Sequence, residues 1–256
     1  TTLRLDAQQL IFGEDEQVLA QPDEGLSILP TPTPEPTPEP TPTPEPRRYN
    51  VLDIDFQSLA EEEEDPILKA MHEYFGSREP TAKNEYTGLF AGKNLVFLTA
   101  EGFSPYAVDE QLTPTLYKLA NSGFIFENFY TPLWWVSTSD GEYVNTQSLI
   151  PKAGVWSMYT SGSNELPLTL GNQFSRLGYT TRAYHNHYFD YYGRDVSHPN
   201  LGYTYTGRGN GLDMEDTWPE SDLEMMEETV ADYLNDAPFH VYYMTVSGHL
   251  NYTFES

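Results

Sequence analysis

The sequence predicts an α/β fold with a largely parallel β-sheet flanked by helices. Beyond residue 90, short apolar runs typical of strands alternate with stretches typical of helices, which is the pattern of parallel strands joined by helical connections. Polar side chains also follow three of the strand-like runs, and sites in parallel sheets gather at the carboxyl ends of strands. The 256 residues suffice for one such domain and a separate leader.

Residues 1–48 are expected to be a disordered leader that contains a spacer rich in proline, threonine and glutamate. From Pro30 to Pro46, proline occupies every second position. Because proline fixes φ and lacks an N–H donor, this segment favours an extended polyproline II conformation. At ~3.1 Å per residue the spacer spans on the order of 50 Å. The composition fits both the stalk of a surface protein and an ordinary linker.

Residues 49–90 are interpreted as a lead-in helical segment. The acidic run 61–65 is expected to open a helix that Asp65 caps, with Pro66 in the first turn. Apolar residues then recur at helical spacing, which predicts a helix that packs on the following domain. The run lacks the glycine and alternating carboxylates of a calcium loop, so we do not interpret it as a calcium site.

Residues 91–256 contain the elements of the predicted sheet. One helix has Thr113 as its cap, Pro114 in its first turn and Gly123 at its end. The other predicted helices span 139–149, 166–177 and 221–234, and the predicted strands span 94–100, 124–130, 179–184 and 239–246.

Composition argues against several functions. Lys and Arg total 13 against 39 Asp and Glu, a formal net charge of −26, which argues against a nucleic-acid-binding surface. Cysteine is absent, which excludes disulfides, thiolate metal sites and a cysteine nucleophile. No run has the length of a membrane span or the pattern of a signal peptide.

The two ends of the chain suggest that it is part of a longer protein. It begins with Thr1 and stops shortly after an apolar strand, so we expect a membrane or targeting segment upstream and further strands downstream. Without those strands, the segment 239–246 is expected to form an exposed sheet edge that promotes aggregation.

The most informative residues are Glu101 and a hydroxyl cluster, Ser137-Thr138-Ser139. Glu101 ends the first apolar run, and Thr138 follows it by 37 residues at the start of a predicted helix. A hydroxyl nucleophile needs activation, which a divalent cation with hard oxygen ligands provides while it neutralises a phosphate. The helix N-terminus adds positive potential for the phosphoryl oxygens. The pattern predicts half of a metal-assisted phosphoryl-transfer site, or else an ordinary strand end and helix cap.

Three histidines follow the later strands. His185 and His187 come after the third predicted strand, and His249 comes after the fourth. A single histidine is most often a hydrogen-bonded loop residue, but the shared position predicts that all three lie at one rim with Glu101. Because alternate residues of an extended chain point the same way, His187 can act as a supporting partner of His185.

Six segments carry a family resemblance. They are Lys93-Asn-Leu-Val-Phe-Leu-Thr-Ala-Glu-Gly-Phe103, Leu112-Thr-Pro-Thr-Leu-Tyr-Lys-Leu119, Ser137-Thr-Ser-Asp-Gly-Glu142, His185-Asn-His187, Tyr192-Gly-Arg-Asp195 and Ser247-Gly-His249. In this order they resemble the extracellular domain of the lipoteichoic acid synthase family, sulfatase-like members of the alkaline phosphatase superfamily. The resemblance covers about residues 90–256, and its specificity lies in the ordered set because each motif alone is weak.

The resemblance implies an alkaline phosphatase/sulfatase-like sheet, incomplete at the C-terminus, and a reaction. Thr138 matches the family's threonine nucleophile and metal ligand, and Glu101 matches its glutamate ligand of one divalent ion, Mn or Mg. The family transfers glycerol phosphate from a phospholipid to a cell-envelope polymer through a threonine-bound intermediate. The implied location is the extracellular face of a bacterial cell membrane, with membrane attachment through a segment absent from this chain.

The implied pocket for the phosphoglycerol head group consists of His185, Tyr192, Arg194 and His249. Tyr192 stands where the family has tryptophan. An arginine near the phosphate also makes independent physical sense, because its planar fork binds two phosphate oxygens at once.

Two further departures separate the chain from the family pattern. The segment Trp134-Trp-Val-Ser137 replaces a glycine-rich approach and a lysine before the nucleophile. The family's remaining metal ligands, an Asp-His pair well downstream of His249, fall beyond the end of the sequence. We therefore expect this chain alone to bind metal weakly and to lack turnover.

Alternative functions stay open on the same scaffold. The Cys/Ser-x-Pro-x-Arg context of the sulfatase nucleophile does not occur, so sulfate ester hydrolysis is not expected. A different phosphotransferase or phosphodiesterase, for example one that transfers phosphoethanolamine, is one alternative. A non-catalytic surface protein that binds envelope polymer is another, because fold does not fix function.

Overall fold

The computed structural model describes residues 48–132 and 134–249. Contacts divide the chain into two compact units, Thr1–Lys83 and Asn84–Ser256. The proline-rich spacer lies outside the described residues. Within those residues, no helix has both the length and the apolar character needed to cross a membrane.

The first unit contains two helices, α1 (Phe56–Glu62) and α2 (Pro66–Gly76). The predicted cap is confirmed, because the Asp65 side chain accepts hydrogen bonds from the backbone N–H groups of Ile67 and Leu68. The expected helix is also confirmed, because α2 begins at Pro66 directly after the acidic run, but not all of the run belongs to this helix start. The first residues of the run end α1, and the rest connect α1 to α2. No residue of α2 is buried, and its packing on the following domain stays a prediction.

The second unit begins with β1 (Leu95–Thr99), a short 3₁₀ helix η1 (Pro105–Ala107) and α3 (Pro114–Ser122). Thr113 precedes α3 as predicted, but its hydroxyl donates to the Ala107 carbonyl and does not cap the helix. The predicted strand 124–130 is wrong. The segment is apolar, but no strand of the described sheet pairs with it, and Phe124 instead contacts the rings of Tyr86 and Phe90.

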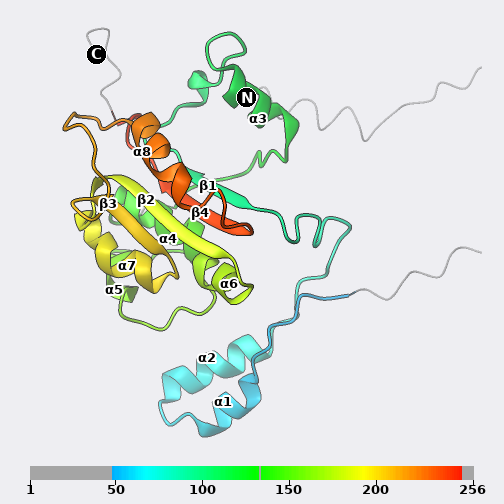
Figure 1. Cartoon of the computed structure of the whole chain (residues 1–256). Helices are drawn as coiled ribbons and strands as arrows, with labels where there is room; N and C mark the ends of the chain where they lie inside the picture. The colour runs from blue at the N-terminus through cyan, green and yellow to red at the C-terminus, as the bar shows by residue number, and fades with distance from the viewer. Residues whose placement is uncertain (1–47, 133, 250–256) are drawn as a thin grey trace, which may run out of the picture. The chain divides into compact units, whose positions relative to one another are not determined.

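The sheet has four strands, which are β1, β2 (Thr180–Tyr188), β3 (Thr204–Arg208) and β4 (Phe239–Met244). Their order is β1-β4-β2-β3 and every pairing is parallel, so the predicted fold class is confirmed (Figure 1). The expectation of an exposed edge at 239–246 is wrong. β4 lies between β1 and β2 and is buried along its whole length, as its largely apolar sequence favours.

Helices connect the strands and flank the sheet. In chain order they are α4 (Ser137–Gln147), α5 (Ser157–Ser161), α6 (Leu170–Arg176), η2 (Tyr191–Gly193), α7 (Arg194–Asn200), α8 (Asp222–Thr229) and η3 (Val230–Asp232). The predicted helix 166–177 begins four residues late, at Leu170, and the Thr169 hydroxyl before it donates to the Leu201 carbonyl and does not cap the helix. Strand β3 and helices α1, α5 and α7 were not predicted from the sequence.

The core has two layers, one on each face of the sheet. Tyr242 packs on one face in a buried cluster with Met158, whereas its neighbour Tyr243 packs on the other face with Met225. Alternate strand residues point to opposite faces, so a strand buried on both sides is largely apolar. Each large side chain buried in this way contributes about 1.5–3 kcal/mol to folding. This double-sided core fixes the strand ends that carry the candidate site.

Candidate active site

The residues singled out from the sequence converge on one cavity of about 60 Å³. It lies where β1, β2 and β4 end and α4 begins. Its lining consists of Glu101, Thr138, His185, His187, Tyr191, Tyr192, Arg194, Trp218, Met244, Val246 and His249. All six predicted site residues are in this set. The predicted rim is therefore present, and the roles of its residues stay predictions.

Glu101, Thr138 and His249 are in direct contact. The Thr138 hydroxyl donates to Glu101 Oε1 at 3.3 Å, and His249 Nδ1 lies 2.8 Å from Glu101 Oε2. The backbone N–H of Glu101 donates to the Thr245 hydroxyl. Neighbouring strands β1 and β4 thus place their terminal loops side by side, which brings the carboxylate, hydroxyl and imidazole together.

Close packing of two glycines allows this contact. Gly102 has a φ of +63°, and a Cβ at this position would lie 2.5 Å from the Gly248 carbonyl oxygen. A side chain here would be strained by both its backbone conformation and this contact. The glycines therefore let the Glu101 and His249 loops approach one another.

The start of α4 depends on Asp140. The residue before the helix, Val136, has no side-chain acceptor to cap it. Asp140 Oδ2 instead accepts the backbone N–H groups of Trp134, Trp135 and Val136 at 2.9, 2.7 and 3.0 Å. A buried carboxylate that accepts three donors fixes the loop in front of Thr138. In this chain the Trp-Trp-Val segment is thus fastened to the helix that it precedes.

The structure separates the three hydroxyls of the Ser-Thr-Ser cluster. Ser139 is fully buried, and its hydroxyl accepts the Trp156 indole N–H at 2.8 Å. Ser137 is exposed and does not line the cavity. Thr138 lines the cavity and points its hydroxyl at Glu101. The geometry thus favours Thr138 as the reactive hydroxyl.

Arg194 is held by a buried carboxylate that the sequence reasoning missed. Glu142 lies one helical turn after Thr138, and its Oε2 accepts Arg194 Nε at 3.0 Å and Nη2 at 2.7 Å. Burial alone raises the pKa of Glu142, but the charge of Arg194, with the contribution of His198, outweighs it and holds this pKa well below its ordinary value. Glu142 therefore stays ionised and orients the guanidinium.

Arg194 also lines the cavity. Nη1 donates to the Tyr191 carbonyl at 3.4 Å, and the guanidinium has further N–H donors on both terminal nitrogens. Its carbon lies 5.2 Å from the centroid of the Tyr192 ring, a favourable cation–π distance. Tyr192 adopts a φ of 61°, which is uncommon for a residue with a side chain. The turn at Tyr192 leads directly into α7, of which Arg194 is the first residue.

His185 is neutral, and one of its two ring nitrogens can accept a hydrogen bond from a molecule in the cavity. Its Nδ1 lies 3.1 Å from the Met244 carbonyl oxygen, and because a carbonyl only accepts, Nδ1 carries the hydrogen. Burial and the nearby Arg194 charge hold the pKa of His185 well below its ordinary value. The other ring nitrogen, Nε2, therefore carries a lone pair.

Both His185 and His187 lie within β2, so the prediction that they follow the strand is wrong. Pairing with β3 carries β2 on to Tyr188, with an irregular register between His185 and Tyr188. The prediction that the two histidines point the same way is confirmed, since both line the cavity with ring centroids 6.0 Å apart.

The site offers part of a metal coordination sphere. The Glu101 carboxylate and the Thr138 hydroxyl are adjacent hard oxygen donors, which suit Mg or Mn. Within residues 48–132 and 134–249, no group of three or more His, Cys, Asp or Glu side chains is arranged to bind a metal ion. The residues present thus fit two positions of such a sphere.

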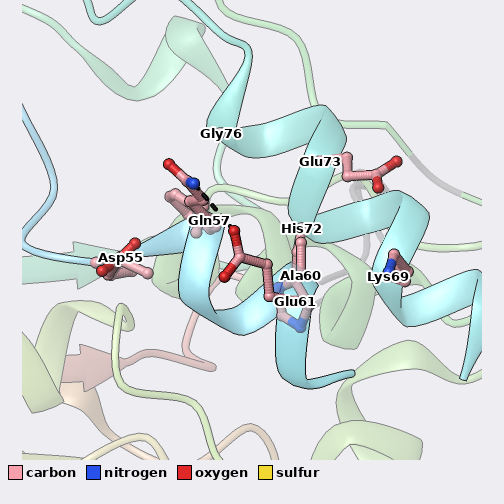
Figure 2. A pocket seen from close by; sticks show the side chains of 10 residues that line it. Asp55, Gln57, Ala60, Glu61, Lys69, His72, Glu73 and Gly76 are labelled. Atoms are coloured by element: carbon pink, nitrogen blue, oxygen red, sulfur yellow. Dashed lines mark hydrogen bonds between the residues drawn. The ribbon is translucent and has the colours of Figure 1, made fainter. Parts of the chain in front are cut away.

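A larger cavity of about 520 Å³ lies between α1 and α2 in the first unit (Figure 2). Gln57 donates to Glu61 there at 3.0 Å, and His72 and Lys69 also line the space. Its side chains are mostly exposed surface groups, without a hydroxyl nucleophile or a buried charge. The chemistry therefore favours the smaller cavity at the sheet.

Comparison with known proteins agrees with this fold. The family model described as Sulfatase matches residues 93–255, and the chain belongs to this family. The chain is 28% identical over 207 residues to the lipoteichoic acid synthase of Staphylococcus saprophyticus, covering 74% of this chain and 31% of that protein. It is also 28% identical over 183 residues to lipoteichoic acid synthase 1 of Bacillus subtilis, covering 67% and 27%.

A solved structure shares the same fold. The lipoteichoic acid synthase LtaP from Listeria monocytogenes matches with a TM-score of 0.57 at 23% identity, over 65% of this chain and 43% of that chain. The resemblance stated from the motifs is thus confirmed as distant homology. The chain spans less than a third of the length of the two curated relatives.

Proposed function

We propose that this chain carries the nucleophile half of a metal-dependent phosphoglycerol transferase. The enzyme would move glycerol phosphate from a phospholipid to a cell-envelope polymer through a phosphoryl-Thr138 intermediate. The observation that carries the proposal is the contact between the Thr138 hydroxyl and Glu101 on a cavity that Arg194 also lines. The names of the relatives support the substrate class, and the activity belongs to the whole protein.

The proposed roles follow from the side chains. Thr138 attacks the phosphorus atom, and Arg194 binds phosphate oxygens through the N–H groups that Glu142 leaves free. The N-terminus of α4 adds positive potential beside the same oxygens. His185 Nε2 accepts a hydrogen bond from a hydroxyl of the glycerol group, while Tyr192 and His249 form the sides of the pocket.

A divalent ion, Mn or Mg, would be bound by Glu101 and Thr138 together with ligands from outside the described residues. Family membership suggests a metal site. When bound, such an ion supplies charge neutralisation at the phosphate and lowers the pKa of the hydroxyl. The Asp-His pair expected downstream would complete the sphere. The proposed location is the extracellular face of a bacterial cell membrane.

Two matched alanine variants test the nucleophile. In the full-length protein, Thr138→Ala should reduce release of glycerol phosphate from phosphatidylglycerol vesicles by roughly 10⁴-fold or more, with little change in melting temperature. Ser139→Ala should retain turnover and lose stability, because the Trp156 indole N–H loses its buried acceptor, at a cost of about 1–3 kcal/mol. The opposite pattern would transfer the nucleophile role to Ser139.

The same vesicle assay distinguishes the alternatives. Release of phosphoethanolamine but not glycerol phosphate would indicate a different phosphotransferase with the same nucleophile. Absence of turnover for both head groups, with retained binding of envelope polymer, would indicate a non-catalytic binding protein.

A further inference from the structure

His187 lines the same cavity, and the proposed function gives it no role. Its Nδ1 lies 2.6 Å from Glu220 Oε1, and the Glu220 side chain is 1% exposed. Because an ionised carboxylate only accepts hydrogen bonds, Nδ1 carries the hydrogen. Nδ1 and Nε2 lie on different edges of the ring, so this pair leaves Nε2 as the nitrogen available to a molecule in the cavity.

Glu220 is fixed firmly enough to orient the imidazole. Arg208 Nη1 donates to the same Oε1 atom at 3.1 Å, and the Glu220 backbone carbonyl accepts from the side chains of Asn186 and Ser247. Glu220 is therefore held behind His187 through both its carboxylate and its backbone carbonyl.

The backbone and two rings hold His187 at the cavity. The register of β2 against β3 shifts between His185 and Tyr188, and irregularities of this kind redirect side chains beside active sites. The rings of Tyr191 and Trp218 pack edge-on to the imidazole, with centroids 4.8 and 5.7 Å away. In the part of the chain that the structure describes, no hydrogen bond to His187 Nε2 is present.

The two cavity histidines have opposite electrostatic surroundings. Burial and the nearby Arg194 charge hold the pKa of His185 well below its ordinary value and keep the ring neutral. His187 donates to a carboxylate, an arrangement that orients the imidazole in catalytic triads. The other titratable groups that contact the His187 ring are His185, Tyr188 and Tyr191, and Arg208 acts on it through Glu220. His187 is thus suited to exchange a proton.

We propose that His187 is the acid and base of the transfer, oriented by Glu220; this inference rests on the proposed function. In the first step Thr138 Oγ forms a bond to phosphorus, the bond to the departing alcohol oxygen breaks, and that oxygen takes the proton from His187 Nε2. The Thr138 hydroxyl proton passes to solvent. In the second step the oxygen of the acceptor hydroxyl bonds to phosphorus and its proton goes to His187 Nε2. The bond between phosphorus and Thr138 Oγ breaks, and Oγ regains a proton from solvent.

Comparison of two leaving groups tests this role. A glycerol phosphodiester of a simple alkyl alcohol needs a proton on the departing oxygen, whereas its p-nitrophenyl counterpart departs as a stable anion. In the full-length protein, His187→Gln should lower kcat/KM for the alkyl substrate by about 10²–10⁴-fold and for the nitrophenyl substrate by less than about 10-fold. Glu220→Gln should show the same selectivity, with a smaller loss.

Controls separate this inference from folding and from the proposed function. His72→Gln, in the first unit and remote in function from this cavity, should leave both rates unchanged. Equal losses on the two substrates in folded His187→Gln, or in folded Glu220→Gln if the first variant does not fold, would overturn the acid–base role. Wild-type protein that turns over neither substrate would overturn the proposed function itself.

Discussion

The pairing of Glu142 with Arg194 is the interaction whose removal should have the largest effect on the site. The two side chains are 1% and 2% exposed. In Glu142→Gln the size of the side chain is kept, but the Arg194 charge stays buried without its counter-charge. Removing one partner of a buried pair typically costs about 3–5 kcal/mol. We therefore expect Glu142→Gln to lower the free energy of unfolding by about this amount.

Two further groups contribute to the cost of Glu142→Gln. The Tyr242 hydroxyl donates to Glu142 Oε1 at 3.0 Å, and His198 Nε2 lies 3.3 Å from the same oxygen as a close contact without hydrogen-bond geometry. A glutamine can orient its oxygen toward only part of this set, and its amide N–H₂ would face another donor. Because of these added losses, we expect Glu142→Gln to lower the free energy of unfolding by about 4 kcal/mol, near the middle of the range for a broken buried pair.

Urea unfolding at pH 7, followed by tryptophan fluorescence, measures this change. Glu142→Gln, Arg194→Met and the double variant form a cycle, and contact between the side chains predicts a coupling energy of about 1–3 kcal/mol. A loss below about 1 kcal/mol for Glu142→Gln, or strictly additive losses, would refute the reasoning.

The pH dependence of the same cycle has a defined sign. Because the folded-state pKa of Glu142 lies below its ordinary value of 4.5, its contribution is fully present above pH 4.5 and is lost as pH falls below that value. The difference between wild type and Glu142→Gln should therefore shrink on acidification.

Three other predictions concern the loops, the core and the metal. Gly102→Ala should lower both stability and activity, because its Cβ would lie 2.5 Å from the Gly248 carbonyl oxygen; unchanged melting and turnover would contradict this. Burial lowers the pKa of His240 to about 4, so the unfolded chain binds its proton first and stability should fall by on the order of 3 kcal/mol between pH 6.5 and 4. His240→Gln should flatten that decline in urea titrations at successive pH values, and an unchanged slope would contradict the assignment. Calorimetric Mn²⁺ titration of this chain should show weak binding through Glu101 and Thr138, whereas micromolar affinity would mean that this chain supplies a more complete site.

The sequence predicts the parallel sheet and the rim because both depend on local pattern. Alternating strands and helices define the connections, and residues that follow parallel strands meet at one edge. Glu101 and His249 were located in this way although 148 positions separate them. The strand predicted at 124–130 failed because a strand also needs a partner, which apolar composition alone does not supply.

The supporting residues of the site could not be predicted in the same way. Glu142 and Arg194 are 52 positions apart, and an acidic residue on a helix is usually exposed. Its spacing of one turn from Thr138 is the signal that could have suggested an inward position. Glu220 lies in an irregular segment before α8, so only the fold reveals its contact with His187. Strand β3 is short and mixes polar residues with glycine, which weakens its pattern.

The most direct measurement of the central claim is mass spectrometry of the covalent intermediate. Full-length protein is mixed with phosphatidylglycerol vesicles and Mn²⁺, quenched in acid during turnover and digested. One peptide, containing Thr138, should gain the mass of a glycerol phosphoryl group, and fragmentation should assign the group to the Thr138 oxygen. Two results would contradict a phosphoryl-Thr138 intermediate. One is turnover with the group on Ser137 or Ser139, and the other is a Thr138→Ala variant that keeps its activity without forming a modified peptide.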